Sequence, residues 1–158
     1  MSKNTLIVIA VWLGLAYGIY ILAEGMLNPN KVEVLGEDRT VTLQRGPDGH
    51  YRAEALINGQ RVNVLVDTGA TGVAISQRVA DKLGITSRTA VRTRTANGDA
   101  VAYMTRLQSV KIGGVEAKDV SALIAPGLGG DVLLGMSYLG RMDVRLYQGT
   151  MTIRQLEN

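Results

Sequence analysis

The sequence predicts an all-β domain with one or two short helices, preceded by an N-terminal transmembrane helix. Short runs in which apolar and polar residues alternate recur along most of the chain, which is the pattern of half-buried strands. The chain contains 19 glycines, and this number favours frequent turns over long helices. An uncharged apolar run near the N-terminus has the length of a membrane span. These three observations predict the fold class.

The apolar run TLIVIAVWLGLAYGIYILA extends from Thr5 to Ala23. At about 1.5 Å per residue it covers roughly 28 Å, close to the thickness of a bilayer's hydrocarbon core. Lys3 precedes it and Glu24 follows it, which by the positive-inside tendency keeps the N-terminus in the cytoplasm. We therefore expect residues 1–24 to anchor a single-pass protein in an inner or plasma membrane, with the remainder periplasmic or otherwise extracytoplasmic. A cleaved signal peptide and the reversed topology are the alternatives.

The rest of the chain divides into a tether at residues 25–38, which shows little periodicity, and a folded domain at residues 39–158. Asn58-Gly59 and Asn97-Gly98 are strong hairpin signals. Ser76 is suited to begin a short helix and Gly84 to end it. We expect strands at 40–45, 50–57, 60–66, 73–75, 89–95, 101–107, 109–112, 115–117, 120–124, 142–146 and 150–154, and helices at 77–83 and 136–139.

Composition argues against several kinds of site. The chain has no cysteine, which excludes disulfides, thiolate catalysis and cysteine-ligated metals. His50 is the single histidine, lies beside a Gly-Pro-Asp-Gly turn, and is expected to be an ordinary surface residue. The basic residues are scattered and are not interleaved with aromatic ones, which argues against nucleic-acid binding. The glycine-rich stretch 127–130 lacks the Lys-Ser/Thr pair of a phosphate loop. We expect neither a metal nor a cofactor.

The most informative segment is Val64-Leu65-Val66-Asp67-Thr68-Gly69-Ala70, where an apolar strand ends in an acid. A carboxylate at the end of a buried strand is costly unless it accepts hydrogen bonds. Gly69 allows the backbone to turn so that its N–H approaches that carboxylate, and Thr68 adds a hydroxyl that can lock the loop. The alternative interpretation is an Asp-Thr-Gly turn without chemistry.

Three motifs together resemble the retropepsin-like aspartic proteases, in particular their bacterial membrane-anchored, single-domain branch, from near Arg39 to near Arg154. The first is Asp67-Thr68-Gly69-Ala70, which resembles the family's active-site loop. The second is a hairpin with Ala96-Asn97-Gly98 at its tip, in the position of the family's flap. The third is Val132-Leu133-Leu134-Gly135, similar to the strand that passes behind the catalytic loop, although Met136 then follows where retroviral enzymes usually have a basic or polar residue.

The resemblance implies a retropepsin-like single-lobe acid protease fold and peptide hydrolysis by two carboxyl groups that share one proton. Because the chain has a single Asp-Thr-Gly, it implies a homodimer in which Asp67 of each copy supplies half of the pair. It also implies that Thr68 buttresses the paired loops, that Gly69 donates its N–H to the pair, and that the flap closes over an extended polypeptide. Asp131 is the alternative partner within one chain, but it lacks a Thr-Gly neighbour and is expected in a solvated loop.

Two other functions stay open at this stage. The first is a catalytically silent dimeric module that keeps the groove for binding a peptide segment. The second is a membrane-anchored structural or adaptor module in which Asp67 would be dispensable. The intact Asp67-Thr68-Gly69 favours the enzyme over both.

Overall fold

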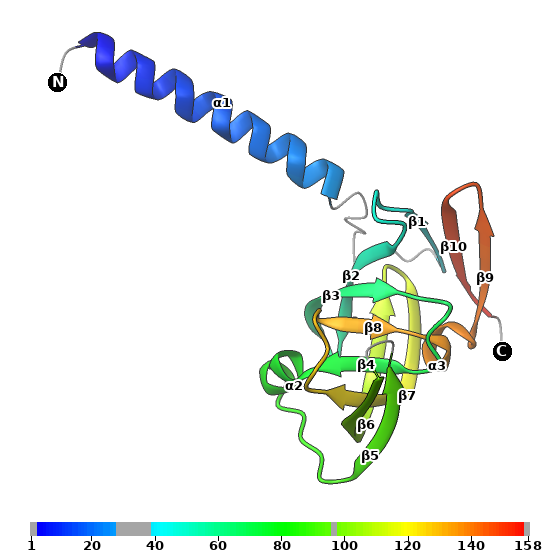
Figure 1. The fold of residues 1–158 in the computed structure, drawn as a ribbon. Coiled ribbons are helices and arrows are strands. Elements are labelled where there is room, and N and C mark those ends of the chain that lie inside the picture. The colour runs from blue at the N-terminus through cyan, green and yellow to red at the C-terminus, as the bar shows by residue number, and fades with distance from the viewer. Residues whose placement is uncertain (1–2, 28–38, 96–97, 157–158) are drawn as a thin grey trace.

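A computed structural model describes residues 3–27, 39–95 and 98–156 (Figure 1). It confirms an all-β domain with short helices behind an N-terminal apolar helix. The helices are α1 (Lys3–Leu27), α2 (Gln77–Leu83) and α3 (Met136–Leu139). The strands are β1 (Thr40–Gln44), β2 (Tyr51–Ile57), β3 (Gln60–Val66), β4 (Val73–Ser76), β5 (Ala90–Thr95), β6 (Gly98–Ile112), β7 (Val115–Ala125), β8 (Val132–Leu134), β9 (Met142–Tyr147) and β10 (Thr150–Gln155).

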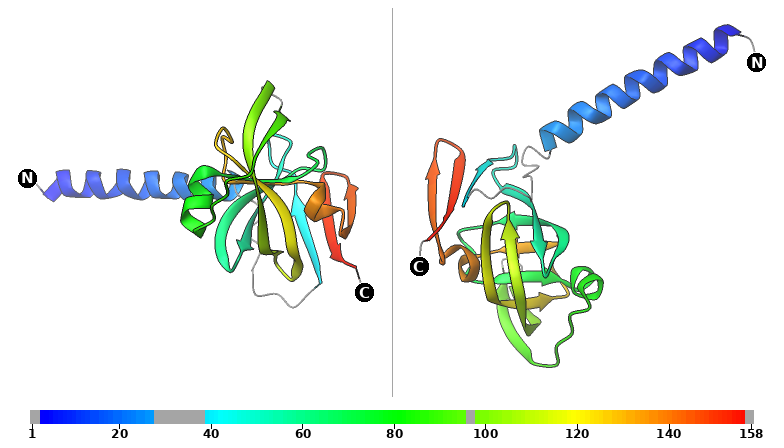
Figure 2. Two further views of the ribbon diagram at one scale, coloured as in Figure 1. Left: turned by 90° about the horizontal axis from the view of Figure 1, so that it is seen from below. Right: turned by 180° about the vertical axis from the view of Figure 1, so that it is seen from behind.

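The strands form two sheets. A seven-stranded sheet has the order β2-β3-β8-β4-β7-β6-β5, and an additional pairing of β2 with β6 curls it back on itself. A three-stranded sheet has the order β1-β10-β9 and flanks it (Figures 1 and 2). Most pairs are antiparallel, but β3 runs parallel to β8 and β4 runs parallel to β7. The C-terminal ends of β3 and β8 therefore lie next to each other, on the same side of the sheet.

Alternating apolar side chains of the strands fill one core. Its largest fully buried members include Leu43, Ile57, Ile75, Leu107, Ile112, Leu134, Tyr138 and Ile153. Each fully buried aliphatic side chain of this size contributes about 1.5–3 kcal/mol relative to leaving it exposed. The aromatic-poor composition is thus sufficient for a core made mainly of aliphatic residues.

Two tight turns fix the hairpin registers. Asn58 and Gly59 have φ angles of 49° and 80°, and Gln148 and Gly149 have φ angles of 46° and 79°. Positive φ at both central residues matches the right-handed twist of the flanking strands. The hairpin predicted at Asn58-Gly59 is confirmed, and β2 pairs with β3 along their whole length.

The prediction of separate strands at 101–107 and 109–112, and at 115–117 and 120–124, is wrong. Each pair of segments is one continuous strand, β6 and β7 respectively. Asp119 lies in β7 with a left-handed φ of 52°. At Asp119 the alternation of buried and exposed residues is interrupted. Ala117 and Val120 are both buried, although residues three apart in a regular strand point to opposite faces. On the two sides of Asp119 different sets of alternating residues are therefore buried, and the strand itself continues through this inversion.

Arg141 holds this inversion in place. Its guanidinium donates to the carbonyl oxygens of Lys118 at 2.6 Å and Asp119 at 3.1 Å. The Asp119 carboxylate accepts from Arg106 on the paired strand, and this hydrogen bond lowers the pKa of Asp119. The pairings on either side, Leu107 with Val120 and Ser109 with Lys118, keep one register.

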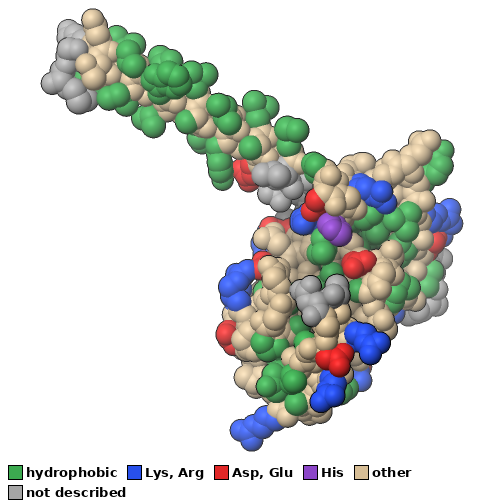
Figure 3. Space-filling view, viewed as in Figure 1, with side chains coloured by type: hydrophobic (Ala, Val, Ile, Leu, Met, Phe, Trp, Pro, Cys, Tyr) green, Lys and Arg blue, Asp and Glu red, His purple; other side chains and the backbone are tan. Residues whose placement is uncertain are grey.

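Helix α1 exposes large apolar side chains from Leu6 to Met26, and Figure 3 shows such side chains along the face in view. Among the described residues it is the one helix long and apolar enough to cross a membrane, between Asn4 and Met26, although a signal sequence would have the same features. The helix continues to Leu27, so the first residues of the predicted tether are helical. The rest of that tether, residues 28–38, lies outside the described residues.

The caps of α2 give a test of the local structure. As predicted, Ser76 begins the helix: its buried hydroxyl oxygen accepts from the N–H of Val79 at 3.3 Å. Gly84 ends it with a left-handed φ of 66°.

We predict that Ser76→Ala lowers the free energy of unfolding by about 1 kcal/mol, because one N–H at the helix start loses its acceptor. Urea denaturation would measure this, with Ser76→Thr as the control that keeps an acceptor; equal losses in both variants would contradict it.

Candidate active site

Asp67 directly follows β3, and the protein backbone fixes its position. Its N–H donates to the carbonyl oxygen of Leu134 at 3.0 Å, which extends the parallel pairing of β3 with β8. The N–H of Gly69 donates to the Asp67 Oδ1 at 2.8 Å. The Ala70 N–H donates to the Asp67 carbonyl at 3.3 Å and closes the turn. Asp67 is half-buried, and its carboxylate is thus held in a fixed direction at the C-terminal end of β3.

The segment Leu133-Leu134-Gly135 lies directly behind this loop. Leu133 pairs with Leu65 of β3 on one side and with Ala74 of β4 on the other. Beyond it, the N–H of Met136 donates to the Ala70 carbonyl at 2.8 Å, and the N–H of Ser137 donates to the Thr71 carbonyl at 3.0 Å. The structure therefore brings together two of the three predicted motifs.

Gly135 has no room for a side chain. A Cβ atom there would lie 2.3 Å from the carbonyl oxygen of Gly72 and 2.5 Å from that of Ala70. Both obstacles are backbone atoms, which cannot rotate away as a side chain would. The two segments can pack this closely only because residue 135 is glycine.

Ser137 is a site residue that sequence reasoning missed. Its hydroxyl accepts from the N–H of Val73 at 3.0 Å and donates to the carbonyl of Ser121 in β7 at 3.2 Å. It thereby joins the end of the Asp67 loop to the strand pair β6–β7. The only signal in the sequence is a small hydroxyl residue two positions after the close-packed glycine, and its partners are 64 and 16 residues away.

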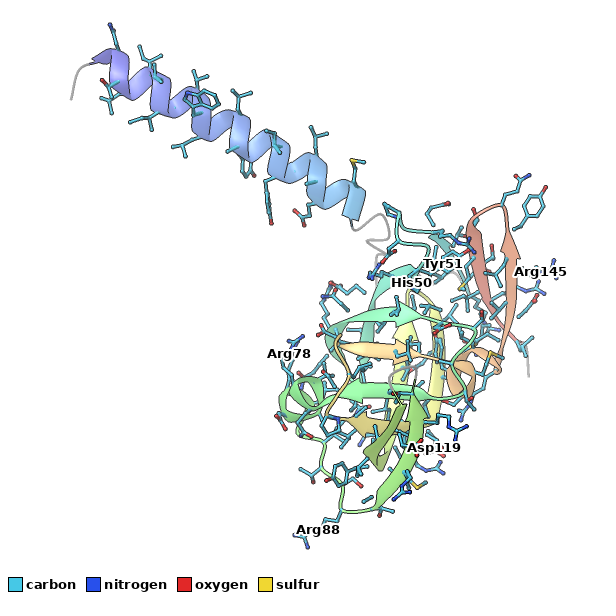
Figure 4. The ribbon with its side chains drawn as sticks, viewed as in Figure 1. His50, Tyr51, Arg78, Arg88, Asp119 and Arg145 are labelled. Carbon is cyan, nitrogen blue, oxygen red and sulfur yellow. The ribbon has the colours of Figure 1, made fainter. Side chains whose placement is uncertain are left out.

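Asp131 lies at the other end of β8 from the Asp67 loop. Since Val132 is level with Val64, Asp131 is level with Asn63, about 13 Å along the sheet from Asp67 at 3.3 Å per residue. Its carboxylate pairs with Arg78 of α2, on the side of the molecule opposite α3 (Figure 4). The expectation of a solvated loop residue is corrected, because the side chain is ion-paired and only 19% exposed. Asp131 is not placed to pair with Asp67 in the same chain.

The predicted flap hairpin consists of β5 and the first part of β6. It stands out from the body of the domain (Figure 2, left). Gly98 begins β6 with a φ of 106°, and its carbonyl accepts from the Thr95 hydroxyl at 2.9 Å. Ala96 and Asn97, which were predicted at the tip, lie outside the described residues. His50 is exposed, as predicted, and its backbone N–H donates to the Asp48 Oδ1.

Residues 53–141, more than half of the chain, match the family model described as gag-polyprotein putative aspartyl protease. The chain belongs to the retropepsin-like aspartic proteases. The matched residues contain the Asp67 loop, the flap hairpin and the Leu133–Gly135 strand, and leave out β1 and the β9–β10 hairpin.

Solved structures agree with this family. The chain is similar to the crystal structure of a retropepsin-like aspartic protease from Rickettsia conorii, with 30% identity and a TM-score of 0.66 over 73% of this chain and 90% of that one. It also has the fold of the EIAV protease complexed with the inhibitor HBY-793, with 23% identity and a TM-score of 0.51 over 60% of this chain and 88% of that one.

Two curated relatives are uncharacterized proteins. A Sinorhizobium sp protein from the cobV 5′ region is 34% identical over 108 residues, which are 66% of this chain and 46% of the relative. A Rickettsia prowazekii (strain Madrid E) protein is 36% identical over 104 residues, which are 64% of this chain and 45% of the relative. The chain thus spans about half the length of the curated relatives it matches.

The close approach at Gly135 gives a prediction for this retropepsin-like domain. Gly135→Ala would place a methyl group against two backbone carbonyls, so we expect a loss of at least about 2 kcal/mol in the free energy of unfolding. Gly129→Ala is the matched control, because a Cβ there meets nothing within 4 Å. Thermal unfolding of the two variants would compare them; a Gly135→Ala protein as stable as the control would contradict the packing described here.

Proposed function

We propose that the chain is a membrane-anchored aspartic endopeptidase that hydrolyses peptide bonds as a homodimer, with one Asp67 from each copy. The observation that carries this proposal is the Asp67 carboxylate, held at the end of β3 by the Gly69 N–H within a retropepsin-like fold. A binding or adaptor module has no evident need for an acid fixed in this way.

Two carboxyl groups that share one proton can carry out the reaction. The ionised carboxyl removes a proton from a water molecule, and the protonated one donates to the oxygen of the scissile carbonyl as the water attacks. The resulting tetrahedral intermediate breaks down when the amide nitrogen receives a proton and the C–N bond cleaves. Two carboxyl groups this close cannot both be ionised, so the pair titrates as a unit.

The arrangement within one chain supports pairing between chains. Asp131 is turned toward Arg78 at the far end of β8, which leaves Asp67 without a second carboxyl from that position. Thr68 and Gly69 are exposed, so a second copy related by a two-fold axis could pack its own loop against them. In that arrangement Thr68 would buttress the two loops.

The flap hairpin supports a polypeptide substrate. We propose that β5 and β6, with Ala96-Asn97-Gly98 at the tip, close over a peptide in extended conformation, which would add to the site as a strand. Opening and closing of such a hairpin would control access to the pair of Asp67 carboxyl groups.

We further propose that residues 1–24 form the membrane anchor, residues 25–38 the tether, and residues 39–158 the protease domain. The apolar length of α1 supports the anchor, and Lys3 before it supports an extracytoplasmic domain. Confinement to two dimensions would favour the pairing of copies.

Substitution of Asp67 tests the proposed catalytic role. The full chain in detergent micelles should cleave a mixed peptide library between about pH 4 and 8, and Asp67→Asn should lower the rate at least about a hundredfold, because the amide can neither accept nor share the proton. The variant should keep its thermal unfolding temperature. Equal cleavage by parent and variant would contradict the mechanism, and silence from both would favour the peptide-binding module.

Mixing the parent with Asp67→Asn tests whether each copy supplies half of the pair. At equal amounts and random pairing, about a quarter of the dimers hold two aspartates, so activity should fall to about a quarter of that of the parent at the same total concentration. A fall to one half would show that each copy acts alone.

The proposed topology has its own test. A protease added to intact spheroplasts should remove the domain, while a tag placed before Met1 should stay protected until the membrane is permeabilised, because Lys3 holds the N-terminus in the cytoplasm. Protection of the domain with exposure of the tag would reverse the topology, and release of the domain in soluble form would indicate a cleaved signal peptide.

A further inference from the structure

The flap hairpin turns one of its two faces toward the body of the domain. Tyr103 of β6 packs against the hydrophobic core, and side chains two positions apart along a strand share a face. Val101 and Asp99 therefore continue the face of Tyr103 toward the tip. In β5, Arg92 lies opposite Val101 and Arg94 lies opposite Asp99. These five residues form the inner face of the hairpin.

The inner face is open to solvent beyond Tyr103. The side chain of Arg94 is 90% exposed, Val101 is 57% exposed, and Arg92 is exposed as well. These side chains lie where the hairpin stands out from the body of the domain (Figure 2, left). A ligand that lies under the hairpin would therefore meet two guanidinium groups and one apolar side chain.

The charges of the inner face are not balanced within the chain. Asp99 is its one carboxylate, and it lies 3.7 Å from Arg94, with both side chains largely exposed. An exposed pair of this kind contributes little and exchanges readily for another partner. Arg92 lies opposite Val101 and not opposite an acid, and within the described part of the chain its guanidinium has no ion pair or hydrogen bond. The inner face thus keeps a net positive charge.

We propose that this face selects polypeptide substrates with acidic side chains, and that Arg92 and Arg94 each bind one carboxylate of the extended peptide. The inference rests on the proposed function and names the substrate class of that site. A guanidinium group matches a carboxylate with two parallel N–H···O hydrogen bonds, which are stronger than bonds between neutral groups. The two arginines are thus specificity-determining residues and take no part in the chemical step.

The spacing of the arginines predicts the spacing of the acids. Arg92 and Arg94 are two positions apart in β5, which corresponds to about 6.6 Å at 3.3 Å per residue. A peptide bound as a strand presents the side chains of one face at the same interval. The favoured segment therefore has acidic residues two positions apart, as in Glu-x-Glu, whereas two adjacent acids would point to opposite faces.

Closure of the hairpin would strengthen these contacts. Val101 lies opposite Arg92, so a bound peptide would bury the valine together with the apolar stem of the arginine. Removal of water from around a carboxylate and a guanidinium strengthens the attraction between them. In the proposed homodimer each copy contributes one hairpin, so acidic residues are expected on both sides of the cleaved bond.

Binding to the full chain with Asp67→Asn, in micelles of an uncharged detergent, tests the proposal without cleavage. The probes are fluorescent peptides of one sequence that carry Glu-x-Glu, Gln-x-Gln or Lys-x-Lys at the same two positions. At about pH 6, where glutamate is ionised, we expect the Glu peptide to bind about tenfold more tightly than the Gln peptide. Arg92→Gln combined with Arg94→Gln should remove this difference. Arg106→Gln, on β6 outside the hairpin, is the matched control and should keep it.

Reversal of the charges gives a gain of binding as a second readout. Arg92→Glu combined with Arg94→Glu should bind the Lys peptide more tightly than the Glu peptide, while the thermal unfolding temperature stays unchanged because both side chains are exposed. Equal binding of the Glu and Gln peptides by the Asp67→Asn chain would overturn the proposal, as would a preference that survives loss of both arginines. Equally tight binding of a short oligonucleotide would show a general attraction of anions and overturn the assignment to peptides.

Cleavage by the chain that retains Asp67 separates this proposal from the proposed function. The Glu peptide should have a higher kcat/KM than the Gln peptide, mainly through a lower KM, because the arginines bind the peptide and not the reacting atoms. Equal kcat/KM values would overturn the acidic preference and leave the protease intact. Preferred binding of the Glu peptide without any cleavage would overturn the protease and leave the inner face as a binding site for acidic peptides.

Discussion

The close contact of Gly135 with the carbonyls of Ala70 and Gly72 is the constraint on which the candidate site depends. Because residue 135 has no side chain, β8 and the start of α3 can lie against the Asp67 loop and donate N–H groups to its carbonyls. A loop of this kind would otherwise leave those carbonyls to water and hold its carboxylate less firmly. The rigidity of the site is thus built by backbone contacts and not by a large set of side chains.

The same short helix connects the site to the flap. Ser137 joins the end of the Asp67 loop to Ser121 of β7, and Arg141 binds the carbonyls at the inversion around Asp119. Both contacts act on the β6–β7 pair, and β6 also forms one side of the flap hairpin. α3 and its flanking residues therefore contact both the end of the Asp67 loop and the β6–β7 pair, whose strand β6 also continues into the predicted flap hairpin.

The sequence was most informative where structure depends on local chemistry. Asn58-Gly59 forms its turn because both residues tolerate positive φ, and Ser76 begins α2 and Gly84 ends it by contacts within a few residues. Predictions failed where a distant partner decides. The prediction ended one strand at Ala117 and began the next at Val120, yet Arg141 stabilises the left-handed conformation of Asp119 inside one continuous strand. Asp131 was expected to be solvated because it follows a Gly-Gly turn, and the sequence does not show that its partner Arg78 comes from another element. Ser137 gave only a weak signal for the same reason, because its partners Val73 and Ser121 lie on other elements.

Under the proposed function, a single Asp-Thr-Gly per chain couples assembly to chemistry. A protein with both acids in one chain could be active at any dilution, whereas a chain with one acid gains its site only when a second copy arrives. Under the proposed function each copy brings its own Asp67 loop, so the close contact of Gly135 with that loop acts in both halves of the site.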